Sequence, residues 1–198
     1  MPVDPPRDSL SALELSLMLR VQVFCYTRAM RGLGISLIAV VACALAVNAQ
    51  QPAASIDLPE GARTLLQAKG DGVQIYSCTD SAAGAKWTLK GPDAKLLDDS
   101  GKAIGTHFAG PTWKLNDGGQ VQGELLGNKP SPEAGSIPWL LLRAKAGTAT
   151  GSLAAVSFIR RTETHGGAAP GTGCQTSQDA GKTVQVPYTA TYTFYTEK

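Results

Sequence analysis

The chain has 198 residues, of which 43% are hydrophobic and 17% are charged, with 22 glycines and 12 prolines. Its formal net charge is +2 and its basic residues are scattered, so the charge pattern gives no support for binding to nucleic acid. The length suits one domain, and the glycine and proline content favours turns and strands over long helices.

The first feature along the chain is a basic and then apolar segment. Arg28 and Arg31 precede an apolar run over residues 32–47 that is too short for a spanning helix, which needs about 20 residues. Val47 and Ala49 place small side chains where a signal peptidase reads them. This pattern predicts an N-terminal signal helix, cleavage after Ala49, and export to the periplasm or to the outside of the cell.

Two alternatives concern the same region. Met30 is a candidate for the true start, because residues 1–29 contain the acidic residues Asp4, Asp8 and Glu14 within what would be the basic end of a signal. Otherwise, these residues form a long n-region with an amphipathic helix. The segment that ends at Cys43 loosely resembles a lipobox, in which case a lipid on Cys43 would anchor the protein.

The predicted cleavage site divides the chain into three parts. Residues 1–49 form the extension and the signal peptide, and residues 50–60, rich in proline, alanine and serine, form a flexible leader. Residues 61–198 form a single β domain, in which we expect no stable membrane span.

Only two of the four cysteines, Cys78 and Cys174, lie in the predicted mature chain. An oxidising compartment would join them in a disulfide, although two unpaired thiols remain an alternative. Closing so long a loop contributes about 4–5 kcal/mol in the chain-entropy model. Two cysteines are too few ligands for a metal site, and we expect no metal and no other cofactor.

The first part of the domain predicts strands joined by tight turns. Residues 63–68 fit either a strand or a short helix. Residues 72–78 and 85–90 alternate apolar and polar side chains on either side of a turn at residues 80–84, which predicts a hairpin.

Two more hairpins follow by the same reasoning. Residues 94–98 and 103–108 flank an Asp-Ser-Gly turn, and residues 112–115 and 121–126 flank an Asn-Asp-Gly-Gly turn. Such closely spaced turns are typical of all-β domains.

The second half of the domain is less regular. Residues 137–144 form a continuous apolar run, which suits a strand buried on both faces or a turn of buried helix. Residues 153–161 alternate again, and residues 184–195 form a long closing strand. Residues 123–138 could hold one short helix. We therefore predict an antiparallel sandwich or barrel of roughly eight to ten short strands.

Residues 72–195 resemble the DUF3455 family of exported bacterial and fungal proteins, a domain of unknown function. The resemblance implies an exported protein without an established activity, and it transfers no catalytic residue. It is carried by Gly72-Val-Gln-Ile-Tyr-Ser-Cys78, His107-Phe-Ala-Gly-Pro-Thr-Trp113, Ile137-Pro-Trp-Leu-Leu-Leu142, Thr164-His-Gly-Gly-Ala-Ala-Pro170, Cys174 and Val186-Pro-Tyr-Thr-Ala-Thr-Tyr192.

His107 is the first candidate for a functional residue. It leaves a predicted strand just before a Gly-Pro turn, where a side chain can face a cleft, and histidine suits acid–base chemistry or ligand binding near neutral pH. The alternative is a histidine that bonds to the backbone at the end of a strand. His165, before two glycines, is the second histidine candidate.

The two histidines could form half of a metal site, with Asp117, Glu124 or Glu163 as the third ligand. They lack a spaced ligand motif, so we predict no metal there. Asp117 remains a candidate for ligand binding, although an acidic residue in a turn is also expected without any function.

The three tryptophans either fill the core of a small β domain or stack on a flat ligand such as a sugar ring. The core is favoured for Trp87 and Trp139, whereas both interpretations stay open for Trp113. Nucleophile motifs such as Gly-x-Ser-x-Gly are missing from the sequence, although a dispersed triad remains compatible with it.

Three functions are compatible with these patterns. The favoured one is a non-catalytic module of the envelope or the secreted fraction, which binds a sugar or a small apolar ligand near His107, Trp113 and Trp139. The second is a hydrolase or isomerase that uses His107 as its acid or base, which requires a carboxylate beside it in an exposed pocket. The third is a protein-interaction module whose closing strand pairs with a partner.

Overall fold

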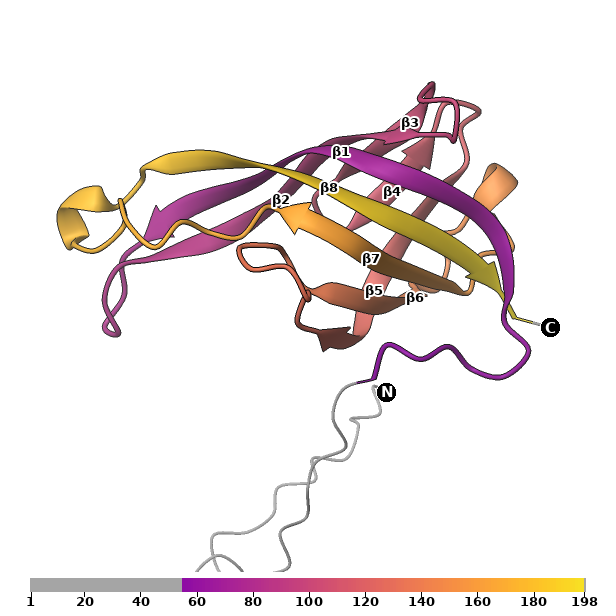
Figure 1. Cartoon of the computed structure of the whole chain (residues 1–198), viewed down its shortest axis with the longest axis horizontal. Coiled ribbons are helices and arrows are strands. Elements are labelled where there is room, and N and C mark those ends of the chain that lie inside the picture. The colour runs from indigo at the N-terminus through magenta and orange to yellow at the C-terminus, as the bar shows by residue number, and fades with distance from the viewer. Residues whose placement is uncertain (1–54, 198) are drawn as a thin grey trace, which may run out of the picture. The chain divides into compact units, whose positions relative to one another are not determined.

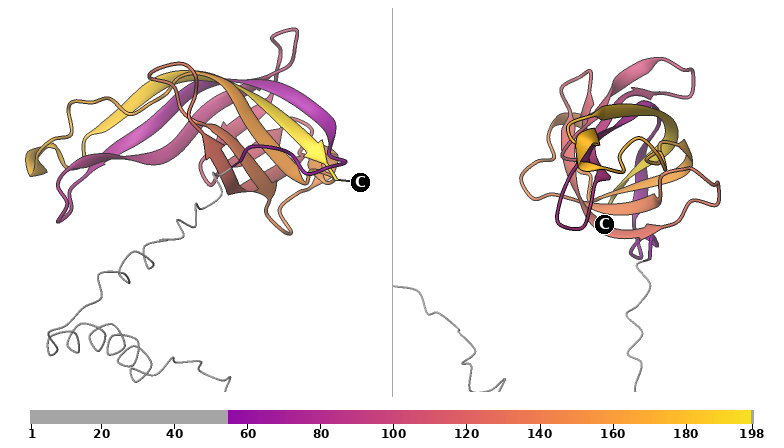
Figure 2. Two further views of the ribbon diagram at one scale, coloured as in Figure 1. Left: turned by 60° about the horizontal axis from the view of Figure 1, so that its bottom comes forward. Right: turned by 90° about the vertical axis from the view of Figure 1, so that its left-hand side faces the viewer.

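The computed structural model describes residues 55–197, in which eight antiparallel strands form one sheet that closes into a barrel (Figure 1). Each strand pairs with its neighbours in the sequence, and β8 also pairs with β1 to complete the ring that is visible end-on in Figure 2. The predicted all-β antiparallel fold is confirmed, as a barrel. The strands are β1 (Arg63–Thr79), β2 (Lys86–Leu97), β3 (Ala103–Phe108), β4 (Thr112–Leu115), β5 (Gln120–Lys129), β6 (Trp139–Ala144), β7 (Phe158–Gly166) and β8 (Thr183–Thr196).

The three predicted hairpins are present, because their turns carry residues that suit tight reversals. Gly101 and Gly118 have φ angles of 82° and 92° in the β2–β3 and β4–β5 turns. Glycine adopts this left-handed conformation without steric cost. Residues 63–68 belong to β1 and are extended, not helical.

The segment before β7 differs from the prediction of a strand over residues 153–161. Residues Gly151–Leu153 form a short 3₁₀ turn, η1, and β7 begins only at Phe158. Leu153 and Val156 are both buried in the core cluster, at a spacing that suits a turn rather than a strand. The predicted option of a short helix within residues 123–138 is also wrong, since β5 extends to Lys129 and a loop follows.

The interior of the barrel is filled by side chains, as expected for an eight-stranded barrel. Two glycines in the strands make room for the larger rings. A Cβ atom on Gly70 would lie 2.5 Å from Cε2 of Tyr192, and one on Gly123 would lie 3.2 Å from Cζ3 of Trp113. The buried residues of this core are Ala68, Ala94, Leu96, Trp113, Val121, Ile137, Leu142, Leu153, Val156, Ile159, Tyr188, Ala190, Tyr192 and Phe194.

A smaller apolar cluster lies on the outside of the sheet. Phe158 and Tyr195 belong to it together with Leu141, and Ile56 and Leu58 pack against it from the segment before β1. This segment therefore covers part of the outer face of β6, β7 and β8.

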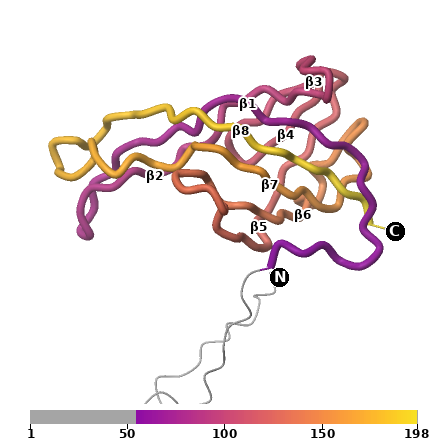
Figure 3. The backbone as a smooth tube through the Cα atoms, viewed as in Figure 1, coloured from indigo at the N-terminus to yellow at the C-terminus, as the bar shows by residue number. Residues whose placement is uncertain are grey.

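Strands β1, β2 and β8 continue past the shorter strands as an arm, on the left in Figure 1. The chain between β7 and β8 follows the arm outward and turns back at its tip, as the tube in Figure 3 shows. A second 3₁₀ turn, η2 (Ser177–Asp179), lies in this segment.

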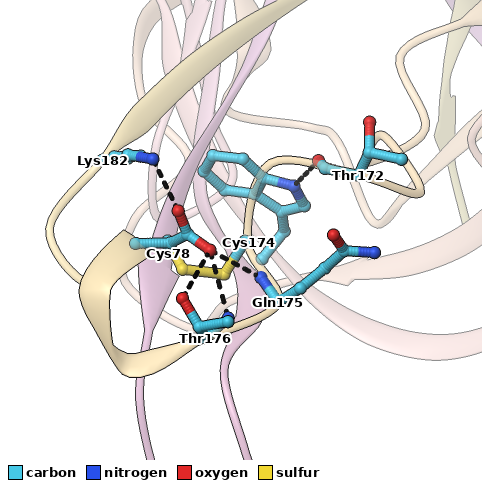
Figure 4. A network of polar contacts seen from close by, with 8 residues as sticks. Cys78, Thr172, Cys174, Gln175, Thr176 and Lys182 are labelled. Carbon is cyan, nitrogen blue, oxygen red and sulfur yellow. Dashed lines mark hydrogen bonds and ion pairs between the residues drawn. A yellow bond between two sulfur atoms is a disulfide. The ribbon is translucent and has the colours of Figure 1, made fainter.

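The expected disulfide between Cys78 and Cys174 is formed at the arm, with a Cα–Cα distance of 5.5 Å (Figure 4). The Nε1 atom of Trp87 donates a hydrogen bond of 3.0 Å to the carbonyl oxygen of Thr172 in the same segment. The carboxylate of Asp179 accepts hydrogen bonds from backbone and side chains around it, and the Lys182 ammonium holds the pKa of this carboxyl well below its usual range. The segment between β7 and β8 is thus fixed to the arm covalently and by polar contacts.

Among residues 55–197, no helix has the length and apolarity needed to cross a membrane. The predicted signal helix, the Met30 start and the Cys43 alternative all concern residues outside the described part of the chain.

Candidate functional site

His107 and Trp113, the first two predicted site residues, lie inside the barrel. They face each other across the β3–β4 pair, and their rings stack with centroids 4.4 Å apart and planes at 7°. The ring of Tyr192 meets both of them edge-on, at 4.9 Å and 5.5 Å. His107 is 2% exposed and Trp113 is 1% exposed, so neither can contact a ligand at the surface.

The environment of His107 keeps its imidazole neutral. Its Nδ1 atom lies 2.9 Å from the carbonyl oxygen of Thr112, and because a carbonyl only accepts, Nδ1 carries the proton. Burial, helped by the charge of Arg161, lowers the pKa of His107 to about 3, although the bond to Thr112 acts in the opposite direction. The alternative interpretation of His107, a histidine bonded to the backbone, describes its place in the structure.

The interior also holds a polar group that the sequence analysis did not identify. The Tyr76 hydroxyl donates to the carbonyl oxygen of Gly167 at 2.6 Å, and the hydroxyls of Tyr188 and Tyr192 share a hydrogen bond of 3.1 Å. Burial raises the pKa of all three tyrosines. These phenols therefore stay protonated and act as internal hydrogen-bonding groups.

Arg161 contributes a charge next to this polar group. Its Nε and Nη2 atoms both donate to the carbonyl oxygen of Pro138, at 3.0 Å and 2.8 Å. The Nε2 atom of Gln74 and the Nε1 atom of Trp113 are buried without a hydrogen-bond partner. The close approach of Gly70 to Tyr192 and of Gly123 to Trp113 shows how closely the aromatic rings fill the interior.

Trp139 and His165, two further predicted site residues, both lie at the outer surface. They border a hollow of about 370 Å³, which we name the Trp139 hollow. The side chains of His165 and Glu133 are joined by a hydrogen bond between Nδ1 and Oε2, and both are exposed, at 63% and 49%. The indole of Trp139 is half-buried. The hollow is lined by Ser131, Pro132, Glu133, Trp139, Glu163, Thr164 and His165.

A bulge in β7 shapes the floor of this hollow. The pairing of β7 with β8 shifts between Thr162 and His165, and Glu163 has a φ of 48°. Within residues 55–197, Glu163 is the one residue other than glycine with a positive φ. A left-handed conformation costs such a residue about 1 kcal/mol, and strained positions of this kind cluster at functional sites.

Hydrogen bonds from both sides hold the bulge in place. The Thr191 hydroxyl donates to Oε2 of Glu163 at 2.6 Å, and the buried Thr164 hydroxyl donates to the carbonyl oxygen of Ile137 at 2.6 Å. Glu163 and His165 therefore project outward from a fixed backbone.

A second hollow of about 330 Å³ shares Glu163 and His165 with the first, and we name it the Lys69 hollow. It lies over the neighbouring strands β8, β1 and β2. Its lining consists of Lys69, Gly70, Asp71, Leu97, Glu163, His165, Thr189, Ala190 and Thr191.

Asp117, the last predicted site residue, is not among the lining residues of either hollow. It lies in the β4–β5 turn, where its Oδ1 atom accepts the N–H of Gly119 at 2.8 Å. This bond, followed by one from the Ser152 hydroxyl, lowers the pKa of the Asp117 carboxyl. Its contacts are those of an acidic residue that stabilises a turn.

Glu133 was not predicted as a site residue, and Glu163 was predicted only as a possible third ligand of a metal site. Glu133 follows Ser-Pro in a loop, so no periodic pattern marked it. In the described part of the chain, no three histidine, cysteine, aspartate or glutamate side chains gather in a way that could hold a metal ion.

The fold and the site together define a class: a small, disulfide-bonded antiparallel barrel with a filled interior and an outer surface hollowed around a bulged strand. The family model described as "Protein of unknown function (DUF3455)" matches residues 59–196, and the chain belongs to this family. Searches of curated proteins and of solved structures each returned no match.

Proposed function

We propose that this protein is an exported, non-catalytic module that binds a sugar in the Trp139 hollow. One observation carries the proposal: a half-buried indole and a paired carboxylate and imidazole border the same open hollow. This combination offers an apolar surface together with fixed polar groups, which is the usual composition of a small-molecule site.

The side chains of the hollow suit the chemistry of a pyranose ring. An indole can pack against the apolar C–H face of the ring. Carboxylates accept hydrogen bonds from hydroxyl groups, and the hydrogen bond with His165 orients the carboxylate of Glu133. The volume of about 370 Å³ falls in the range of small-ligand sites.

The charges that line the hollow favour a neutral sugar. Glu133 and Glu163 are both acidic and His165 is the one basic side chain in the lining, so a uronic acid or a sulfated sugar would face repulsion. A neutral sugar donates hydroxyl hydrogens to these carboxylates without adding a charge.

Export is the second part of the proposal. The Cys78–Cys174 disulfide suits an oxidising compartment, and the N-terminal pattern predicts a signal that ends at Ala49. We therefore place the protein in the periplasm or outside the cell, where neutral glycans of the envelope and its surroundings are accessible.

The two alternative functions have less support. An enzyme that uses His107 needs an exposed pocket with a carboxylate beside this histidine, whereas His107 is 2% exposed and bonds to Thr112. An interaction module that uses the edge of the closing strand needs a long unpaired edge, whereas β8 pairs with β1 along its length and with β7 from Tyr188 to Tyr195, which leaves only residues 183–187 on the arm without a second strand.

The test is a glycan array of neutral and acidic oligosaccharides, followed by titration calorimetry with the best neutral sugar. We expect Trp139→Ala to lower the affinity at least tenfold, and Glu133→Gln and His165→Gln to lower it as well. Matched controls are Trp87→Ala, an indole on the arm, and Glu124→Gln, an exposed carboxylate on β5. The absence of any bound glycan, or equal effects of Trp139→Ala and Trp87→Ala, would refute the proposal.

A further inference from the structure

We infer that the ligand is a neutral oligosaccharide that crosses Glu163 and His165 and occupies both the Trp139 hollow and the Lys69 hollow. This inference rests on the sugar-binding function proposed above and extends it to the length of the ligand. It assigns a second subsite and makes Glu163 the residue that contacts the sugar at the junction.

The two hollows share a wall. Glu163 and His165 line both of them, so a ligand bound in one hollow is adjacent to the other. Their combined volume, about 370 Å³ and 330 Å³, exceeds what a single sugar ring can fill and suits at least two rings.

The strand register beneath the Lys69 hollow aligns polar side chains of four strands. His165 on β7 pairs with Thr189 on β8, Thr189 pairs with Asp71 on β1, and Asp71 pairs with Lys95 on β2. Side chains of directly paired residues lie on the same face of a sheet. A row of polar side chains thus leads away from the Trp139 hollow across the outer face of the barrel.

A parallel row completes this subsite. Lys69 on β1 pairs with Thr191 on β8 and with Leu97 on β2. Towards a bound sugar, the ammonium of Lys69 and the hydroxyl of Thr189 can donate hydrogen bonds and the carboxylate of Asp71 can accept them, while Leu97 adds an apolar wall. The Trp139 hollow is rich in acceptors, so the two hollows differ in the hydroxyl pattern that they recognise.

Glu163 has a left-handed backbone conformation at the junction of the two hollows. Its φ of 48° is one that glycine would adopt without strain, yet the chain has a glutamate there. Thr191 binds only one carboxylate oxygen, Oε2, at 2.6 Å. The side chain is exposed, and within residues 55–197 its other oxygen, Oε1, receives no hydrogen bond and can accept one from a sugar hydroxyl.

The experiment measures affinity as a function of ligand length. Chito-oligosaccharides and cello-oligosaccharides of one to six units are titrated into the oxidised protein by calorimetry. We expect the affinity to rise at least tenfold from one unit to three and then to level off. Asp71→Ala and Lys69→Ala should lower the affinity for the longer sugars about tenfold and leave that for the single unit unchanged, with Lys114→Ala on β4 as the matched control.

A stability measurement separates the role of Glu163 in binding from a structural role. We expect Glu163→Gly to change the melting temperature little, because glycine relaxes the backbone while the hydrogen bond from Thr191 is lost, and to lower the affinity for the longer sugars at least tenfold. A lower melting temperature with unchanged affinity would overturn this role of Glu163.

The outcomes also separate this inference from the proposed function. Binding of single and longer sugars with equal affinity, sensitive to Trp139→Ala but not to Asp71→Ala, would overturn the second subsite and leave the Trp139 hollow as the binding site. Failure of the wild-type protein to bind any sugar would overturn both.

Discussion

Acidification should destabilise the protein through the buried imidazole of His107. In the unfolded chain this histidine titrates near its ordinary pKa of 6.5, whereas burial in the barrel lowers its pKa to about 3. The unfolded state therefore binds a proton that the folded state excludes. The stability contributed by the neutral ring is fully present above pH 6.5 and is lost as the pH falls from 6.5 towards 3.

The size of the effect follows from the two pKa values. Between them, each pH unit changes the free energy of unfolding by about 1.4 kcal/mol. From pH 7 to pH 4.5 the loss is about 2–3 kcal/mol, which is a large part of the total stability of a typical domain, about 5–15 kcal/mol. The carboxyls of Asp98 and Asp117 also have lowered pKa values. The stability that they contribute to the folded state is lost mainly at pH values below the range from pH 7 to pH 4.5.

The assay is urea unfolding, followed by tryptophan fluorescence at a series of pH values, for the wild type and for His107→Gln. Glutamine is neutral at every pH and can still donate to Thr112, so the variant should be less stable at pH 7 but lose less stability on acidification. Changes that arise from other groups cancel in the difference between the two proteins. His107→Phe, which keeps a ring against Trp113, serves as the second variant. Equal pH dependence in wild type and variants would refute this reasoning.

Three further predictions can be tested by simple measurements. Replacing both Cys78 and Cys174 by serine should cost about 2–5 kcal/mol, visible as a lower urea midpoint, and a reductant should have the same effect on the wild type and none on the variant. Gly72→Ala should destabilise the barrel strongly in thermal melts, because the new Cβ would lie 2.2 Å from the backbone oxygen of Asp93, whereas Gly171→Ala, with no atom within 4 Å of its Cβ, should be nearly neutral. Mass spectrometry of the exported protein should give a chain that begins at Gln50, and a chain that retains residues before Ala49 would contradict the predicted cleavage.

The hairpins could be predicted from the sequence because their information is local. The turn at residues 116–119 places asparagine, aspartate and two glycines between short apolar runs, and these residues need no distant partner to reverse the chain. By contrast, closure into a barrel depends on the pairing of β1 with β8, which lie at opposite ends of the domain. No local pattern distinguishes this closure from a sandwich.

The site could be predicted only in part. His107 and Trp113 flank a short turn, so their proximity could be anticipated, but the face on which they lie depends on the register of the whole sheet. The Trp139 hollow needs Glu133 and His165, which come from a loop and from a bulged strand 32 residues apart. An insertion of one residue in β7 changes which side chains face outward, and alternation alone did not reveal it.

The position of the disulfide has a consequence for the order of folding. Pairing between the first and last strands is the least local contact in the barrel, and contacts of this kind slow folding because a long loop must close first. Cys174 lies shortly before β8 and is bonded to Cys78 at the end of β1, so in the oxidised chain the start of β8 is already held beside its partner. Pairing of β1 with β8 can then extend from the tip of the arm towards the barrel, so we expect the ring to close faster in the oxidised chain than in the reduced chain.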